Sequence, residues 1–372
     1  MEKLTVAQLK DKCKEQGLKF TSKSKKNELL ALLGVIVDTT NNEQNDNVER
    51  NVDKGDIKSL FLACFNILRS EGIVGEKGLR YLSYLLSWRL LEPHFNNNTI
   101  DISDVKHYEK LIDDQEKLKD FISYVKWDNL FKEKNRFEQE CRNTWNIVLC
   151  NHPKLSTMFK ENNFPNIKIE NLKKIMETIH SYDLFNVDHD MLGQAYESVI
   201  REGLTGKVLG QFFTPTELRN YMINVIKPKD NESIFDPCCG SGGFLISSKK
   251  YNKNINIYGR EINEETFQLL KSNILISTGE INNNTQLGDS LIGVKDKKFD
   301  IILTNPPFGL KNTRYRDIVN KNNIVDDKNN SLVFPIKSDN ASLLFLELCI
   351  YKLKEGGRCC IVLPDGKEMF LH

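Results

Sequence analysis

The sequence predicts an open α/β sheet in the C-terminal half of the chain, preceded by helical segments. Short apolar runs rich in β-branched and aromatic residues recur after about residue 181, and stretches with helical periodicity separate them. The predicted strands lie near residues 233–236, 255–259, 284–287, 299–304 and 358–364. In such sheets ligands bind at the carboxyl ends of the strands, and Glu261, Asp289 and Asn305 all fall there.

Residues 1–34 form a separate predicted unit with two amphipathic helical segments, in which lysines outnumber acids by 8 to 4. The pattern resembles a SAP domain, a small helical module associated with DNA binding. The resemblance implies that Lys23, Lys25 and Lys26 contact DNA phosphates. The alternative is a two-helix hairpin for protein interaction, whose lysines contact only water.

The chain between this module and the sheet divides into two predicted parts. Residues 35–55 have no hydrophobic period and are predicted to be a flexible linker. Residues 56–180 lack strand alternation and show helical periodicity, so they are predicted to form a helical domain. The sheet and its helices would then occupy residues 181–372.

A glycine-rich turn follows the first predicted strand and contains Asp236, Gly240 and Gly242. Glycines at such a turn let the backbone approach a ligand closely. Many nucleotide-binding folds share this feature, but an acid before the glycines suits an ammonium group better than a pyrophosphate. Glu261, at the end of the next strand, follows Gly242 by 19 residues, the spacing at which a carboxylate meets a ribose diol. Turn capping and a surface charge are the alternative roles for the two acids.

Asn305, Pro306, Pro307 and Phe308 follow the apolar strand at residues 299–304. The Asn305 side-chain oxygen and the Pro306 carbonyl can both accept hydrogen bonds from one amino group on an aromatic ring. Such bonds draw the nitrogen out of conjugation and make it more nucleophilic, while Phe308 can stack on the ring. The two prolines stiffen the turn, so the acceptors are in place before substrate arrives. A strand followed by a plain proline turn is the alternative.

Three motifs occur in a fixed order: Phe-Phe-Thr-Pro at residues 212–215, the glycine turn, and Asn-Pro-Pro-Phe at residues 305–308. In this order they resemble the adenine-N6 DNA methyltransferases, most closely the modification subunits of type I restriction-modification systems. The resemblance covers roughly residues 56–372. It implies a Rossmann-like sheet that uses S-adenosylmethionine to methylate adenine N6 in DNA.

The resemblance also implies roles for individual residues. The implied cofactor-binding residues are Phe212, Thr214, Pro215, Asp236, Gly240, Gly242, Glu261 and Asp289. Of these, Glu261 would bind the ribose hydroxyls and Asp289 the adenine amino group of the cofactor. The target adenine would be flipped out of the duplex and held by Asn305, Pro306, Pro307 and Phe308.

Residues 310–340 carry six basic residues and few apolar ones, and they are predicted to lack secondary structure. Their position after Phe308 would let Arg314 and Arg316 hold phosphates that flank the flipped base. We expect this segment to be disordered without DNA. A mobile loop whose charges contact only water is the alternative.

Composition limits the class of protein. The net charge of +1 means that nucleic-acid contacts must come from local patches. The absence of a long apolar run and of a signal-peptide pattern predicts an intracellular, soluble protein without a membrane partner, in the cytoplasm, the nucleus or a virion. The nine cysteines and six histidines show no metal-ligand spacing, so no metal site is predicted.

The sequence also predicts dependence on a partner. Only 60 residues separate Gly243 from Thr304, and 63 follow Gly309, too few in either place for a target-recognition domain. A separate specificity subunit is therefore expected, and because relatives continue beyond the fifth strand, the chain is expected to be truncated or partner-dependent. The alternatives are a protein glutamine methyltransferase, whose similar turn usually carries tyrosine, and a non-catalytic DNA-binding or assembly subunit. Phe308 and the Phe-Phe-Thr-Pro motif favour DNA as substrate.

Overall fold

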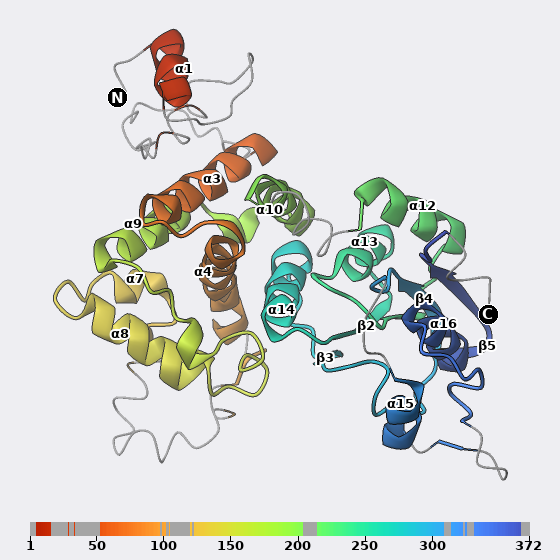
Figure 1. Cartoon of the computed structure of the whole chain (residues 1–372). Coiled ribbons are helices and arrows are strands. Elements are labelled where there is room, and N and C mark those ends of the chain that lie inside the picture. Colours follow the sequence, from red (N-terminus) through yellow and green to blue (C-terminus); the bar gives the residue numbers. More distant parts are fainter. Residues whose placement is uncertain are drawn as a thin grey trace. The chain divides into compact units, whose positions relative to one another are not determined.

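The computed structural model describes residues 5–15, 29, 33, 53–96, 99–101, 104, 120, 123–203, 214–308, 314–322, 324–325 and 331–365. The chain divides into two compact units (Figure 1). The first contains Met1–Thr205 and Leu275–Gly279, and the second contains Gly206–Ile274 and Glu280–His372. This division lies further along the chain than the predicted boundary after residue 180.

The first unit is helical throughout its described residues, as the sequence predicts. Its α-helices are α1 (Val6–Glu15), α3 (Lys54–Ser70), α4 (Gly75–Asn96), α7 (Trp127–Leu130), α8 (Phe137–Asn143), α9 (Ile169–His180) and α10 (His189–Gly203). A π-helix at Thr144–Leu149 and 3₁₀ turns at Glu161–Asn163 and Leu184–Asn186 complete it. Helix α3 packs against α9 and α10. Its start is fixed by a capping box between Asp53 and Asp56, so the last residues of the predicted linker belong to this helix.

Aromatic side chains dominate the core of this unit. Trp88, Trp127 and Trp145 are fully buried, and Trp88 meets both others in edge-to-face contacts. Helix α4 supplies Trp88 and is buried from Tyr81 to Leu91, including its serines. It therefore forms the centre of the unit, and its apolar residues are core rather than a binding surface.

Only part of the predicted SAP-like module is described. Helix α1 buries Leu9 and Cys13, and the Cys13 thiol contacts the Leu29 carbonyl oxygen at 3.7 Å. Lys23, Lys25 and Lys26 lie outside the described residues. The module and its DNA contacts remain predictions.

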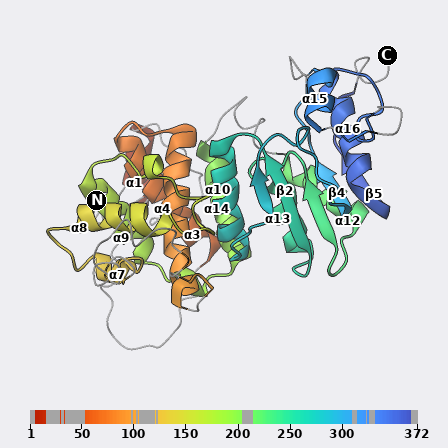
Figure 2. The same cartoon turned by 90° about the horizontal axis from the view of Figure 1, so that it is seen from below.

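The second unit contains the predicted parallel sheet (Figure 2). Its strands are β1 (Ser233–Asp236), β2 (Asn256–Glu261), β3 (Thr285–Leu287), β4 (Phe299–Thr304) and β5 (Leu353–Ile361). They lie in the order β3-β2-β1-β4-β5, and every neighbouring pair is parallel. The chain leaves β1 in one direction and returns to its other side at β4, which is the switch point where ligands bind in open α/β sheets.

Alternating side chains of the strands fill two cores, because successive residues point to opposite faces. On one face Ile234 and Ile301 pack with residues of α12 (Thr216–Ile226), α13 (Gly243–Tyr251) and α14 (Glu264–Thr278). On the other face Phe235 and Ile302 pack with Cys349 of α16 (Ala341–Lys352). The sheet is therefore buried on both sides, as its continuous apolar strands require.

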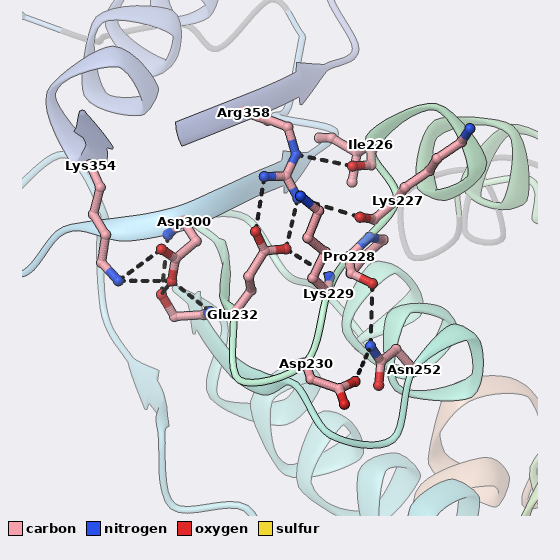
Figure 3. A network of polar contacts seen from close by, with 11 residues as sticks. Ile226, Lys227, Pro228, Lys229, Asp230, Glu232, Asn252, Asp300, Lys354 and Arg358 are labelled. Carbon is pink, nitrogen blue, oxygen red and sulfur yellow. Dashed lines mark hydrogen bonds and ion pairs between the residues drawn. The ribbon is translucent and has the colours of Figure 1, made fainter. Parts of the chain in front are cut away.

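A polar network holds the amino end of this sheet together (Figure 3). The Arg358 guanidinium on β5 donates to both carboxylate oxygens of Glu232 at 2.9 and 2.7 Å, and also to the Ile226 carbonyl at 3.0 Å. Asp300 on β4 accepts hydrogen bonds from Lys354 and from Ser233. Burial alone would raise the pKa of Asp300, but these donors outweigh it and lower the pKa to about 2. The network ties β5 to the start of β1, at the end of the sheet away from the predicted site.

The prediction of no secondary structure in residues 310–340 is wrong for part of that segment. Tyr315–Asn322 forms α15, and Val325 pairs with Ser331 in an isolated bridge. Ile318 and Phe334 are buried against α16. The apolar side chains at Tyr315, Ile318 and Val319 have helical spacing, which the surrounding charges obscured. Arg314 and Arg316 are exposed.

No helix within the described ranges is long and apolar enough to cross a bilayer. All nine cysteines are free thiols, and five of them are buried.

Candidate active site

The four chemically important loops of the second unit follow the carboxyl ends of adjacent strands. Asp236 ends β1, Glu261 ends β2, Asp289 follows β3 and Asn305 follows β4. Because the strands are parallel and lie in the order β3-β2-β1-β4, the four side chains belong to one edge of the sheet. The sequence predicts each residue at the end of a strand, and the observed strand order shows that these four strand ends are neighbours.

Asp236 is buried beneath this edge, with 1% of its surface exposed. Its Oδ1 accepts hydrogen bonds from the Thr304 hydroxyl at 2.7 Å and from the Cys238 amide at 3.0 Å. Burial raises the pKa of the carboxyl to about 7, although both hydrogen bonds oppose the rise. A cation placed beside Asp236 would therefore favour its ionised form.

The glycine turn depends on backbone conformations that other residues adopt poorly. Gly240 and Gly242 have φ values of 52° and 92°. A Cβ atom on Gly242 would lie 2.6 Å from a methyl carbon of Leu270. A side chain at this position would therefore strain the backbone and require Leu270 to shift.

Glu261 has a structural role in addition to the predicted one. Its Oε2 accepts a hydrogen bond from the Gly240 amide at 3.0 Å, and its Oε1 accepts one from the Asn263 amide at 2.8 Å. The turn-capping alternative is thus present in the structure. Each carboxylate oxygen still has a second lone pair, so both can accept a further hydrogen bond from a ligand.

The loop after β3 is fixed to its neighbours. The Gly288 amide donates to the Glu261 carbonyl at 2.7 Å, and the Ser290 hydroxyl donates to the Pro237 carbonyl at 2.6 Å. Asp289 is half-buried between them, and its Oδ1 accepts from the Leu291 amide at 2.9 Å. The loops after β1, β2 and β3 therefore form one connected surface.

Asn305 provides the least satisfied polar atom of the site. Its Nδ2 donates to the Thr214 hydroxyl at 3.3 Å, which orients the amide. Its Oδ1 is buried and has no hydrogen-bond partner in the described part of the chain. A buried acceptor without a partner costs about 1–3 kcal/mol, so a ligand that donates to it recovers this energy. Phe308, at the end of the turn, is 50% exposed.

Not all of the remaining predicted residues are among those that the structure describes. Phe212 lies outside the described residues, whereas Pro215 is the exposed N-cap of α12 and Pro306 is buried. The sequence analysis missed Thr304, whose hydroxyl holds Asp236 across two strands. The sequence feature that could have identified Thr304 is its position as a polar residue at the end of an otherwise apolar strand.

Comparison with known proteins agrees with this geometry. The family model described as N-6 DNA Methylase matches residues 187–370. This part of the chain is therefore similar to the N-6 DNA methylase family. The match includes every strand of the sheet and the whole edge that carries Asp236 and Asn305.

Individual relatives match over part of their length. The methylase subunit of the type I restriction enzyme EcoEI from Escherichia coli is 29% identical over 214 residues, which are 52% of this chain and 41% of that protein. The type II methyltransferase M.VspI from Vibrio sp. (strain 343) is 36% identical over 141 residues, covering 36% and 34% of the two chains. The chain thus spans less than half the length of these relatives.

A solved structure shows the same fold. The methyltransferase subunit of a type I restriction-modification system from Streptococcus thermophilus has a TM-score of 0.58 and 17% identity, covering 84% of this chain and 75% of that one.

Proposed function

We propose that this chain transfers a methyl group from S-adenosylmethionine to adenine N6 in DNA, as the modification subunit of a restriction-modification-like system. The observation that carries the proposal is Asn305 Oδ1, which is buried after β4 and has no hydrogen-bond partner among the described residues, in the same turn as the exposed Phe308. The similarity of residues 187–370 to the N-6 DNA methylase family supports it.

The residues along the sheet edge fit the proposed cofactor in its extended form. Asp236, which is buried and has a pKa of about 7, would pair with the ammonium of the methionine part. The glycine turn would lie against the same part, and Glu261 and Asp289 would accept hydrogen bonds from the ribose and the adenine. The cofactor, when bound, would supply an electrophilic methyl group.

The Asn305 turn would hold the target base. Asn305 Oδ1 and the Pro306 carbonyl would accept hydrogen bonds from both N–H groups of the adenine amino group, which would reduce the conjugation of its nitrogen lone pair with the ring. Phe308 would stack on the base after it leaves the duplex. Holding the nitrogen in line with the methyl group would supply most of the rate through orientation, with no covalent intermediate on the protein.

Specificity for a DNA sequence would come from another subunit. The residues between the glycine turn and β4 form α13, β2, α14 and β3, which leaves no room there for a recognition domain. Residues 1–34 would add DNA affinity that does not depend on sequence, through the lysines at 23, 25 and 26. Deleting residues 1–34 should then lower the affinity for every DNA duplex by a similar factor. If the deletion leaves DNA affinity and its salt dependence unchanged, the module is a hairpin for protein interaction instead.

Two assays on the full chain test the proposal. Calorimetry should detect S-adenosylmethionine binding that Asp236→Ala abolishes and that Asn256→Ala, an exposed residue at the start of β2, leaves intact. Radiolabelled methyl transfer, with and without a candidate specificity subunit, should label DNA and not a glutamine-containing peptide. Cofactor binding without transfer to DNA under either condition would instead support the non-catalytic assembly subunit.

A further inference from the structure

A cavity lies on the face of the sheet that α16 covers. Tyr258 and Arg260 of β2 and Phe299 of β4 line it, together with the segment between β3 and β4. Its volume is about 150 Å³. Asp236, Glu261, Asp289 and Asn305 do not line it, although Ser290, next to Asp289, does.

Four cationic side chains line this cavity: Arg260, Lys295, Lys297 and Lys352. No aspartate or glutamate is among its lining residues. The nearby Asp296 is exposed, and its carboxylate faces Tyr351 at 3.2 Å and Lys298 at 3.8 Å. Four like charges around one recess repel each other, and the repulsion is strongest where water is partly excluded. An anion that enters the recess would reduce this repulsion.

Lys352 is the most deeply placed of the four, with 7% of its surface exposed. Its amine donates to the carbonyl oxygens of Lys295 and Lys297, which fixes it at the base of the cavity. Burial lowers the pKa of this amine to about 8, and the charges of Lys298 and Arg260 add to the effect. An ammonium has three donors, so one remains for a ligand.

Arg260 and Lys297 are also held in position. The Arg260 guanidinium packs against Gly288, where a Cβ atom would lie only 2.9 Å from Nη2. Its Nε is buried and has no hydrogen-bond partner among the described residues. The Lys297 amine lies over the Tyr258 ring, 3.7 Å from its centre. The cations are thus arranged before any ligand binds.

We propose that this cavity binds a phosphate group of a nucleotide, either free or within a nucleic acid strand. A planar guanidinium and converging ammonium groups match a tetrahedral anion with several acceptor oxygens better than they match a single carboxylate. The cavity is large enough for one phosphate group. This proposal does not depend on the methyl-transfer reaction.

Calorimetric titration of the full chain with inorganic phosphate at low ionic strength tests the site. The double variant Arg260→Gln/Lys297→Gln should bind phosphate at least about tenfold more weakly, because each lost charge-assisted hydrogen bond contributes on that scale. Lys253→Gln, which removes one lysine charge from an exposed position in the same unit and so matches the single variant Lys297→Gln, should change the affinity less than twofold.

Circular dichroism would verify that the variants fold. If the double variant does not fold, the phosphate affinity of Lys297→Gln alone, a substitution at an exposed position, tests the same site. Absence of phosphate binding to the wild-type chain, or equal binding to the lysine 297 variant, would overturn the proposal.

Competition then distinguishes the two sources of phosphate. Displacement of bound phosphate by deoxyadenosine 5′-monophosphate but not by a duplex supports a free nucleotide. Displacement by the duplex, lost in the double variant, supports a backbone phosphate. Displacement by neither would overturn the assignment to a nucleotide ligand.

Discussion

Thr304→Val should change how cofactor binding is linked to protons. The substitution keeps the side-chain volume at a fully buried position and removes the 2.7 Å hydrogen bond to Asp236 Oδ1. A hydrogen bond stabilises an ionised carboxylate by about 1.5–3 kcal/mol and a neutral group by about 0.5–1.5 kcal/mol. The difference of about 1.4 kcal/mol corresponds to a tenfold change in the ionisation equilibrium, so the Asp236 pKa should rise from about 7 to about 8.

The magnitude follows from the protonation of Asp236 at pH 7. With a pKa of about 7, about half of the carboxyl groups carry a proton before the cofactor binds, whereas about nine-tenths do in the variant. Binding of the cofactor ammonium requires the ionised form, so proton release should rise from about 0.5 to about 0.9 per site. The apparent affinity at pH 7 should fall about fivefold for the same reason.

Calorimetry of S-adenosylmethionine binding in two buffers of different ionisation enthalpy measures this release directly. Thr304→Ser, which keeps the hydroxyl, should behave like the wild-type chain, and Asp236→Asn should show no release from this group. Equal proton release in the wild-type and Thr304→Val chains would refute the role given to Thr304.

Three further predictions address the turn, the network and the DNA contacts. Gly242→Ala should weaken cofactor binding at least about tenfold, because the left-handed conformation costs about 1–2 kcal/mol and the new methyl meets Leu270 at 2.6 Å. Gly293→Ala, also at positive φ but with no atom within 4 Å, is the control, and equal calorimetric affinities of the two variants would contradict this reading. Asp300→Asn should lower the free energy of unfolding by about 2 kcal/mol at neutral pH, since the folded pKa lies below its ordinary value near 4. That contribution is present above about pH 4 and lost as pH falls toward 2, so urea titrations should show the two proteins converging in acid. A difference that persists at pH 2 would argue against the ion pair as its source. Arg314→Ala/Arg316→Ala should weaken DNA binding at low salt and spare cofactor affinity, because both side chains are exposed and lie at the start of α15. Unchanged duplex affinity in a gel-shift titration would remove these arginines from the DNA interface.

Local sequence patterns were sufficient to predict the sheet. Strands β1 and β4 lie where the apolar runs predict them, because a strand buried on both faces needs a continuous apolar run. Strand β5 begins at Leu353, earlier than predicted, because α16 passes directly into it through polar residues and two glycines. A strand whose first half is mostly polar residues and glycines gives little apolar signal.

Contacts between distant residues were not predictable in the same way. The bond between Thr304 and Asp236 joins residues 68 positions apart and depends on the pairing of β1 with β4. The same holds for the cationic cavity, whose four charges come from β2, the segment before β4 and the end of α16. Such clusters depend on strand order, which the spacing of apolar residues does not encode.

The most direct test of the proposed reaction is the identity of the methylated nucleoside. DNA incubated with the full chain, S-adenosylmethionine and a candidate specificity subunit would be digested to nucleosides and examined by mass spectrometry. The account predicts N6-methyldeoxyadenosine with the wild-type chain and with Asn256→Ala, and none with Asn305→Ala, which removes the buried acceptor. A product methylated on cytosine, or N6-methyldeoxyadenosine formed at the wild-type rate by Asn305→Ala, would contradict it.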